Sequence, residues 1–515
     1  MDARFAGFWL YSLSLRQSKF AAPISLQAGQ LPHTGRCPEN VPTRTGRDEM
    51  SKQTISQTLA QFATGLAWEQ IPAPVQQRAK LLLIDAVGVA FASTQFDFAQ
   101  RALAALKHLG AGDSPVIGMP ETLALRDAAM LNGMLIHGLD YDDTYLPGSV
   151  HLTATCVPTV LGVAAANGSS GEELLVALAL GLETAARLGS AGRGGFLRAG
   201  FHATSVCGTF GATMAAGRLM KLDAAQLTLA QGAALSMASG TMQPMQDGSW
   251  TKRMHPGWAA VSGITAATLA REGYIGPGEA YEGRFGLFTA FLGTHAKEAD
   301  VSSVVNALGE EWQFPRASVK LFPACHQSHA FFNAAIGIAR EHKISIADID
   351  SIRVRIAEPA IPLVCEPLAA KRRPDSSYAA QFSLPYGIAC CLTRGRFGMA
   401  ELEEPSFTDS SLVALAHKVD YEIDANSGFP KFRTGEVIVN MKNGQKLQKR
   451  EQILPDEPAP AAAILDKFNG TTAPAMPAEG AARIRDMLLG LERLADVRQL
   501  TALLSKVRPR AAIEP

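Results

Sequence analysis

Residues 137–151 hold the densest group of chemically active side chains in this chain. Within fifteen residues they combine three carboxylates, a threonine hydroxyl and two imidazoles, in the order His137, Asp140, Asp142, Asp143, Thr144 and His151. Imidazole and carboxylate groups can move protons or hold cations. The flanking segments are long and apolar, so the stretch is not a solvated loop. We interpret it as one wall of an active site.

The same stretch allows two other interpretations. Asp140, Asp142 and Thr144 match the D-x-D-x-T signature of magnesium-dependent, haloacid-dehalogenase-like phosphatases. That signature follows a strand, whereas residues 127–139 are rich in alanine, methionine and leucine and predict a helix. A helix end with solvated carboxylates would explain one or two of the acids. Short motifs often match by chance, and neither alternative accounts for the whole run.

A second polar group, residues 200–205, precedes a segment rich in glycine and alanine. Thr204 or Ser205 can cap a helix there, which would leave backbone N–H groups for a substrate carboxylate. His202 would then stand beside the bound anion. Taken alone, a histidine next to a helix start is more often structural.

A third polar group, residues 248–256, places three potential cations within four residues: Lys252, Arg253 and His255. Apolar residues, including Trp250 and Trp258, bracket them and predict partial burial. Buried cations need anionic partners, so we expect either the acidic run or a substrate carboxylate beside them.

A fourth polar group, residues 320–329, adds Cys325, His326 and His329. Neighbouring Cys and His residues rarely have the geometry of a nucleophile and its base, so the histidines are the better candidates for proton transfer. Six histidines and the acidic run could together ligate a metal ion. No H-E-x-x-H or comparable spacing supports this, and we predict no metal.

The composition narrows the class of protein. The chain has 515 residues, 47% of them hydrophobic, and its 48 basic residues equal its 48 acidic residues. A neutral chain argues against nucleic-acid binding. Seven scattered cysteines without a C-x-x-C pair indicate buried thiols in a reducing cytoplasm. No apolar run is long enough to predict a membrane span.

Helical periodicity dominates the first half of the chain. It predicts helices over 75–92, 125–139, 156–166, 172–188, 209–220, 224–237 and 261–272. Several are apolar all round, which is typical of the interior of a helical bundle.

After about residue 318 the pattern becomes mixed. Residues 352–356 and 436–441 alternate like strands, and Asn443-Gly444 predicts a hairpin to 446–452. Helices are predicted over 329–341, 378–392 and 479–505, and residues 455–477 are predicted to be a connector.

We expect four regions in the chain. Residues 1–49 lack periodicity and are interpreted as an extension or a wrongly chosen start, with translation beginning at Met50 and Ser51 capping the first helix. Residues 50–317 form the helical domain, 318–475 the α+β domain, and 476–515 the helices that return to the first domain.

Five segments in this order resemble the MmgE/PrpD family: HGLDYDDT, GFHATS, DGSWTKRMHPGWAA, KLFPACHQSH and QFSLPYGIA. The resemblance covers roughly residues 51 to 505. It implies a mainly α fold with a large multi-helix bundle and a smaller α+β lid, paired in a homodimer, with the site between the two domains. It also implies catalysis without metal or cofactor.

Carried over by position, the resemblance implies seven catalytic residues: Asp140, Thr144, His151, His202, Lys252, His329 and Tyr386. We assign substrate binding to Lys252, Arg253, His255, Ser205 and His326. The chain departs from the usual family sequence after His151, where Pro-Ser is common, and at Ala203, where proline is common.

The family resemblance favours a cytoplasmic lyase that dehydrates a small hydroxy-polycarboxylate related to 2-methylcitrate. Lysines would neutralise the substrate carboxylates, and an imidazole would exchange the proton on the neighbouring carbon. The alternatives are an epimerase or decarboxylase for a related polycarboxylate, of the iminodisuccinate or cis-aconitate type. More remote are the phosphatase and a helical scaffold without activity.

Overall fold

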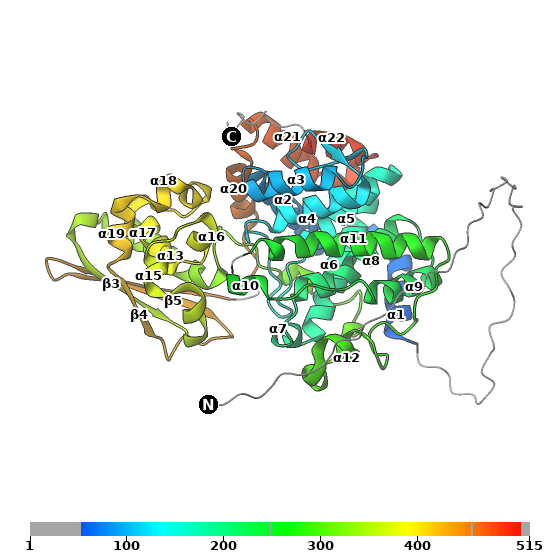
Figure 1. Cartoon of the computed structure of the whole chain (residues 1–515), viewed down its shortest axis with the longest axis horizontal. Coiled ribbons are helices and arrows are strands. Elements are labelled where there is room, and N and C mark those ends of the chain that lie inside the picture. Colours follow the sequence, from blue (N-terminus) through cyan, green and yellow to red (C-terminus); the bar gives the residue numbers. More distant parts are fainter. Residues whose placement is uncertain (1–52, 248, 455–456, 506–515) are drawn as a thin grey trace, which may run out of the picture. The chain divides into compact units, whose positions relative to one another are not determined.

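Helices make up most of the described chain and strands form two small sheets, so the mainly α prediction is confirmed (Figure 1). The computed structural model describes residues 53–247, 249–454 and 457–505, and they belong to one unit that begins at Gln53. The predictions for residues 1–49, Met50 and Ser51 lie outside the described residues. The first described helix is capped by Thr54, whose hydroxyl oxygen accepts a hydrogen bond from the Gln57 N–H at 3.2 Å.

The first part of the fold is a bundle with one two-stranded ribbon. Its helices are α1 (Ile55–Gly65), α2 (Ala73–Ser93), α3 (Asp97–Lys107), α4 (Leu125–His137), α5 (Thr153–Asn167), α6 (Gly171–Ala191), α7 (Gly195–Arg198), α8 (Ala203–Leu219), α9 (Ala224–Leu235), α10 (Pro244–Asp247), α11 (Thr251–Arg271) and α12 (Leu287–Leu292). The ribbon pairs β1 (Ser114–Pro115) with β2 (Thr122–Leu123).

Two helices begin six or more residues earlier than their apolar periodicity predicts. Helix α8 starts at Ala203, six residues before the predicted start, and α11 starts at Thr251, ten residues before it. Pro256 lies inside α11, where its missing N–H removes only one backbone hydrogen bond near the helix start. Lys252, Arg253 and His255 therefore project from a helix.

Glycines allow the helices that carry the polar groups to approach closely. A Cβ atom built on Gly133 of α4 would lie 2.6 Å from the Cα atom of Gly257 in α11. No side chain fits in that space, so both positions require glycine for this crossing. The crossing holds the C-terminal end of α4 near the N-terminal end of α11.

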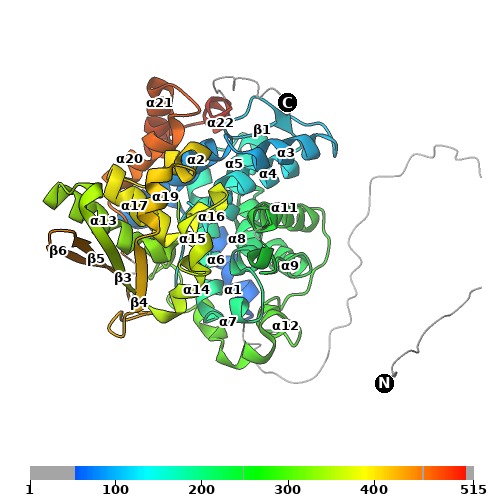
Figure 2. The ribbon, with the colours of Figure 1, turned by 60° about the vertical axis from the view of Figure 1, so that its left-hand side comes forward.

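The second part packs helices against a four-stranded sheet. Its elements are α13 (His329–His342), β3 (Ile349–Ile356), α14 (Ile361–Val364), α15 (Leu368–Arg372), α16 (Ser377–Gln381), α17 (Leu384–Arg394), α18 (Glu404–Phe407), α19 (Ser410–Ala416), β4 (Val419–Ile423), β5 (Arg433–Met441) and β6 (Lys446–Ile453). The strand order is β4-β3-β5-β6, with only β3 and β4 parallel. Figure 2 shows this sheet with α13 and α17 beside it.

The sheet confirms the strands and hairpin predicted from sequence. Gly444 in the β5–β6 turn has φ +87°, a conformation that favours glycine. The predicted helix over 378–392 is wrong in one respect, because the chain breaks between α16 and α17 at Phe382 and Ser383.

The chain then returns to the bundle through α20 (Ala461–Thr472), α21 (Ala478–Leu489) and α22 (Arg498–Leu504). The connector predicted over 455–477 is wrong for α20, whose apolar residues Ile464 and Phe468 are fully buried. These residues are four apart in a helix that packs against α2, and Figure 1 shows the brown-orange ribbon of α20 beside the blue ribbon of α2. The alanine- and proline-rich composition hid this helical spacing.

Buried apolar residues form two clusters within the described chain. One spans residues 59–319 and 464–504, and the other spans 324–447. The domain boundaries given above stay a prediction.

Helix α6 has the length and composition of a membrane span, contrary to the sequence expectation, and 94% of its apolar window is buried inside the protein. Helices α2 and α3, taken as one span, also have the required length and composition, but the pair is bent by 89°. Buried core helices meet the same criterion, so these are weak indicators of a membrane. This holds for the described residues.

Candidate active site

The loop between α4 and α5 carries the acidic residues in a strained conformation. Asp140 has φ +48°, in the left-handed region that costs a residue with a side chain about 1–3 kcal/mol. Three consecutive carbonyl groups around it accept hydrogen bonds from distant side chains. The donors are Gln381 to Leu139, Lys320 to Asp140 at 2.6 Å, and Lys467 to Tyr141 at 2.7 Å. These contacts hold the loop in place.

The Asp140 carboxylate is the electrostatic centre of the site. Its Oδ1 atom lies 3.1 Å from the ammonium groups of both Lys252 and Lys320, and 3.9 Å from Nε2 of His151. Burial would raise the pKa of Asp140, but the two ammonium groups outweigh burial and hold the pKa well below its usual range. Asp140 is therefore ionised, and it faces two cations.

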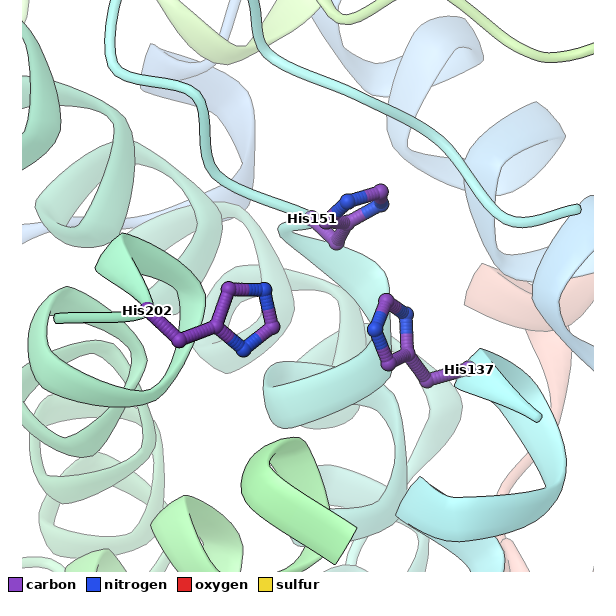
Figure 3. A group of neighbouring side chains, drawn as sticks. All are labelled: His137, His151 and His202. Atoms are coloured by element: carbon purple, nitrogen blue, oxygen red, sulfur yellow. The ribbon is translucent and has the colours of Figure 1, made fainter. Parts of the chain in front are cut away.

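Four histidines from separate segments form a connected group, which reaches this carboxylate through His137 and His151. The ring centroids of His137 and His151 are 4.6 Å apart, those of His137 and His202 are 5.5 Å apart, and those of His151 and His202 are 6.1 Å apart. Figure 3 shows these three rings turned toward one another. His255 follows, with its ring centroid 5.2 Å from that of His202. All four residues are buried.

The partners of the rings decide where their lone pairs lie. Nδ1 of His137 is 2.9 Å from a carboxylate oxygen of Asp142, and Nδ1 of His151 is 2.8 Å from the carbonyl oxygen of Asp143. An ionised carboxylate and a carbonyl only accept hydrogen bonds, so both Nδ1 atoms carry the proton. In the neutral rings Nε2 then holds a lone pair that can take a proton. The Nδ1 atoms of His202 and His255 lie 3.1 Å apart.

Burial keeps most of these imidazoles neutral. Burial, with Lys252, lowers the pKa of His137 to about 4 against the attraction of Asp142. Burial and Lys252 also hold the pKa of His202 well below its usual range. Asp142 behaves oppositely, because His137 and His151 keep its pKa low although burial would raise it. The site thus combines ionised carboxylates with neutral bases.

Asp143 has a structural role. Its carboxylate accepts hydrogen bonds from the backbone N–H groups of Leu152 and Thr153, both at 3.0 Å, at the start of α5. It also accepts a hydrogen bond from the Thr153 hydroxyl at 2.5 Å. Burial and the neighbouring Asp142 raise the pKa of Asp143. Asp143 therefore stabilises the start of α5, but its side chain is fully buried, so the interpretation as a solvated helix end is wrong for this acid.

Arg253 projects from α11 into an aromatic cage. Its guanidinium carbon lies 4.6 Å from the ring centroid of Phe98, 5.9 Å from that of Trp250 and 5.3 Å from that of Tyr378. Burial and Asp140 raise the pKa of Tyr378 to about 12, so its hydroxyl is protonated at neutral pH. Arg253 and Tyr378 thus stand at the α+β side of the Asp140 group.

A second group of site residues lies along the segment that joins the two clusters of buried residues. The backbones of Thr144 and Ser318 exchange two hydrogen bonds, at 2.8 and 2.9 Å, and the Thr144 hydroxyl is buried without a hydrogen-bond partner among the described residues. His326 and His329 have ring centroids 4.6 Å apart and line a cavity of about 190 Å³. Burial lowers the pKa of His329 to about 3.

The structure does not bring every predicted residue to this group. Tyr386 is fully buried among the apolar residues of the α+β part, and its hydroxyl donates to the carbonyl of Glu401 at 2.7 Å. Ser205 is also buried, and its hydroxyl donates to the carbonyl of His255 at 3.2 Å. Neither side chain is free for substrate. The predicted cap is wrong too, because α8 begins after His202 without a side-chain cap.

Three residues of the site were not predicted to be catalytic or to bind substrate: Lys320, Tyr378 and His137. Lys320 lies two residues after Ser318, in a segment that the sequence marked only as polar. Tyr378 begins the predicted helix that also contains Tyr386. His137 begins the acidic stretch, and its Asp142 contact spans five residues. Its position at the end of an apolar helix was the available signal.

Two overlapping sets of side chains can hold a metal ion. One comprises His137, His151 and His202, and the other comprises His137, Asp140, Asp142 and His151. Within each set the possible ligand atoms lie within 4.8 Å of one another. The sequence expectation that the enzyme uses no metal stays a prediction.

The chain matches two sequence models of known domains. The MmgE/PrpD N-terminal domain matches residues 57–300, and the MmgE/PrpD C-terminal domain matches residues 322–493. The chain is 27% identical to the cis-aconitate decarboxylase-like protein oryM of Aspergillus oryzae, over 90% of this chain and 99% of that protein. It is 26% identical to cis-aconitate decarboxylase of Aspergillus terreus, over 90% and 98%. It is also 26% identical to cis-aconitate decarboxylase of Homo sapiens, over 89% and 96%.

Proposed function

The chain belongs to the MmgE/PrpD family, and from this premise we propose that it is a lyase that decarboxylates a small unsaturated polycarboxylate of the cis-aconitate type. The observation that carries the proposal is the pair of ammonium groups, Lys252 and Lys320, that meet at one carboxylate oxygen beside several imidazoles. The relatives named cis-aconitate decarboxylase support the reaction, since they match this chain over about nine-tenths of its length.

The two lysines recognise carboxylates. In the structure the Asp140 carboxylate lies within 3.1 Å of both. A substrate carboxylate entering beside Asp140 would share these cations, while Asp140 holds the two ammonium groups in position. Arg253 and the protonated hydroxyl of Tyr378 stand on the α+β side and would bind a second carboxylate. The unpartnered Thr144 hydroxyl is suited to donate a hydrogen bond to the same substrate.

Decarboxylation breaks the bond between a carbon and the carboxylate that leaves as carbon dioxide. The bonding electron pair passes to that carbon and is delocalised through the adjacent carbon–carbon double bond into the carboxylate beyond it, where Lys252 and Lys320 would stabilise the added charge. The double bond shifts, and a proton must then reach its far carbon, which becomes a methylene group. His151 is the best-placed carrier, because its Nε2 faces Asp140 and its side chain is 11% exposed, enough to exchange protons with solvent.

Dehydration, which the sequence favoured, is the second candidate. It requires a neutral base to take a proton from the carbon next to a carboxylate, and an acid to protonate the departing hydroxyl. The low pKa of His137 and of His202 makes neutral imidazoles available at neutral pH. The substrate would then be a hydroxy-polycarboxylate related to 2-methylcitrate, and the same lysines would bind it.

Proton NMR in D₂O separates these reactions. The enzyme is given cis-aconitate, 2-methylcitrate, citrate and iminodisuccinate in turn. Loss of a carboxylate with a new methylene signal from cis-aconitate is the expected result. New vinyl signals from a hydroxy acid would establish dehydration instead, and deuterium entering a stereocentre without net product would indicate epimerisation. No change with any substrate, in a folded protein, would contradict the proposed substrate class.

A further inference from the structure

The rings of His137, His151 and His202 converge on one buried point (Figure 3). The Nδ1 atom of each ring has a hydrogen-bond partner. The partner is the Asp142 carboxylate for His137, the Asp143 carbonyl for His151 and the His255 ring for His202. Their Nε2 atoms are left for the space between the rings. Nε2 of His137 is fully buried and has no hydrogen-bond partner among the described residues.

This arrangement is close to that of a three-histidine metal site. Four-coordinate zinc binds imidazole nitrogens at about 2.0–2.1 Å, which sets the nitrogens about 3.3 Å and the ring centroids about 5 Å apart. The centroids here are 4.6, 5.5 and 6.1 Å apart, and the ligand atoms lie within 4.8 Å of one another. Shifts of roughly an ångström would close the site.

The groups behind the rings strengthen the likeness. Metal-binding histidines usually donate their other N–H to a carboxylate or a carbonyl, which fixes the ring and makes it a better ligand. His137 and His151 have these two kinds of partner. Asp140 lies 3.9 Å from His151 Nε2 and can supply the fourth ligand, or a water can occupy that position.

We propose that His137, His151 and His202 bind a divalent transition-metal ion of the zinc class, and that the bound ion blocks catalysis. The binding is independent of the reaction. The block rests on the proposed function, because the ion would occupy the imidazole nitrogens that exchange the substrate proton.

The charged side chains around the three rings determine how tightly a divalent metal ion is expected to bind. Asp140 and Asp142 attract a dication, whereas Lys252 and Lys320 repel it. The carboxylates and ammonium groups nearly balance, so binding should be weaker than at a dedicated zinc site. Removal of one ammonium group should strengthen it.

Cobalt is the direct probe, because tetrahedral Co²⁺ absorbs visible light far more strongly than octahedral Co²⁺. Full-length protein, freed of metals with a chelator, is titrated with Co²⁺ in a non-coordinating buffer, and Zn²⁺ is then added. The proposal predicts a saturable, intense visible absorption at one ion per chain that Zn²⁺ displaces. No such absorption, or the weak spectrum of an octahedral ion held by carboxylates, would overturn the three-histidine site.

Three variants test whether the Co²⁺ absorption comes from an ion bound by the three histidines. His202→Asn should lose the intense absorption, whereas His295→Asn, at a histidine outside the group, should keep it. Lys252→Met should bind Co²⁺ roughly tenfold more tightly, since a repelling charge is removed. A gain in affinity cannot come from misfolding. Unchanged absorption in His202→Asn, or weaker binding in Lys252→Met, would contradict the proposal.

A separate experiment tests whether the bound ion inhibits catalysis. Protein loaded with Zn²⁺ and separated from excess metal by gel filtration should lose most of its turnover and regain it after treatment with EDTA. Full turnover by the zinc-loaded protein would refute the block. If the protein turns over none of the polycarboxylates, the Co²⁺ spectrum still decides whether the metal site exists.

Discussion

The carboxylates of Asp140 and Asp85 both contact lysine ammonium groups inside the helical part, yet their pKa values are shifted in opposite directions. Asp140 has two lysines at 3.1 Å, and its pKa lies well below the usual range. Asp85 has Lys467 at 2.6 Å, and burial, only partly offset by that lysine, raises its pKa to about 6. The side chains of the first group are 3–14% exposed, and those of the second pair are 1–3% exposed.

The difference shows what each group is built for. A second cation overcomes the cost of burying a carboxylate, and some access to solvent lets ligands exchange. The Asp140 group can therefore bind and release an anion. The Asp85–Lys467 pair is sealed between α2 and α20. Lys467 also donates a hydrogen bond to the Tyr141 carbonyl, one residue from Asp140. The Asp85–Lys467 pair, called the sealed pair below, therefore supports the loop of the Asp140 group, called the open group.

Removing a cation from the open group should have the largest effect. Lys252→Met should lower kcat/KM about 100- to 1,000-fold, because a charge aimed at the developing carboxylate charge is lost. Steady-state kinetics with the substrate identified by NMR measures the change, and Lys297→Met, on an exposed lysine, is the matched control. Turnover within a few fold of the unaltered enzyme would show that Lys252 has no role in the mechanism. It would also contradict the distinction between a catalytic lysine at Asp140 and a stabilising lysine at Asp85.

Breaking the sealed pair should mainly affect stability. Lys467→Met leaves the Asp85 carboxylate buried without its partner and should cost about 3–5 kcal/mol in the free energy of unfolding. The double variant Asp85→Leu with Lys467→Met removes both charges and should recover most of that loss. Denaturant unfolding of both variants measures this. Turnover that stays low in the stable double variant would show that the Tyr141 contact positions the loop.

The sealed pair should also give a pH signature with a definite sign. The pKa of Asp85 is about 6 in the folded protein and 3.8 as its reference value, so the folded state binds the proton more tightly. The stabilisation from this proton is present below about pH 4 and is lost as the pH rises through about 6, a change of about 3 kcal/mol. Unfolding of the enzyme and of Asp85→Asn is compared at pH 4.5, 5.5 and 7. A difference that does not vary with pH would contradict the raised pKa.

The helix crossing beneath the open group should give the smallest effect on stability. Gly257→Ala inserts a methyl group where α4 and α11 touch, and should cost about 1–3 kcal/mol. Displacing α11 also moves Lys252, so kcat should fall by more than the stability loss explains. Gly278→Ala serves as the control, because a Cβ there has no neighbour within 4 Å. Equal kinetics for the two variants would show that α11 can shift without harm.

Sequence reasoning found the residues that share short motifs. Asp140, His151, His202 and Lys252 were predicted and do meet. Strands β3, β5 and β6 and the Asn443-Gly444 turn were predicted because alternation and turn chemistry are local signals, whereas β4 was not predicted. Helix α20 was missed since its composition resembles a linker, and the early start of α11 was missed since Pro256 normally marks a boundary.

The sequence by itself determined most of the long helices, three of the four strands of the larger sheet, the family and the chemical types of side chain in the site. Only the tertiary structure decided which of them act together. Lys320 and Lys467 reach the acidic loop across 180 and 326 residues of sequence. Tyr386 and Ser205 turn away into hydrogen bonds with backbone carbonyls. Contacts of this kind, and the burial that sets each pKa, depend on how the helices pack, and no local pattern in the chain records that.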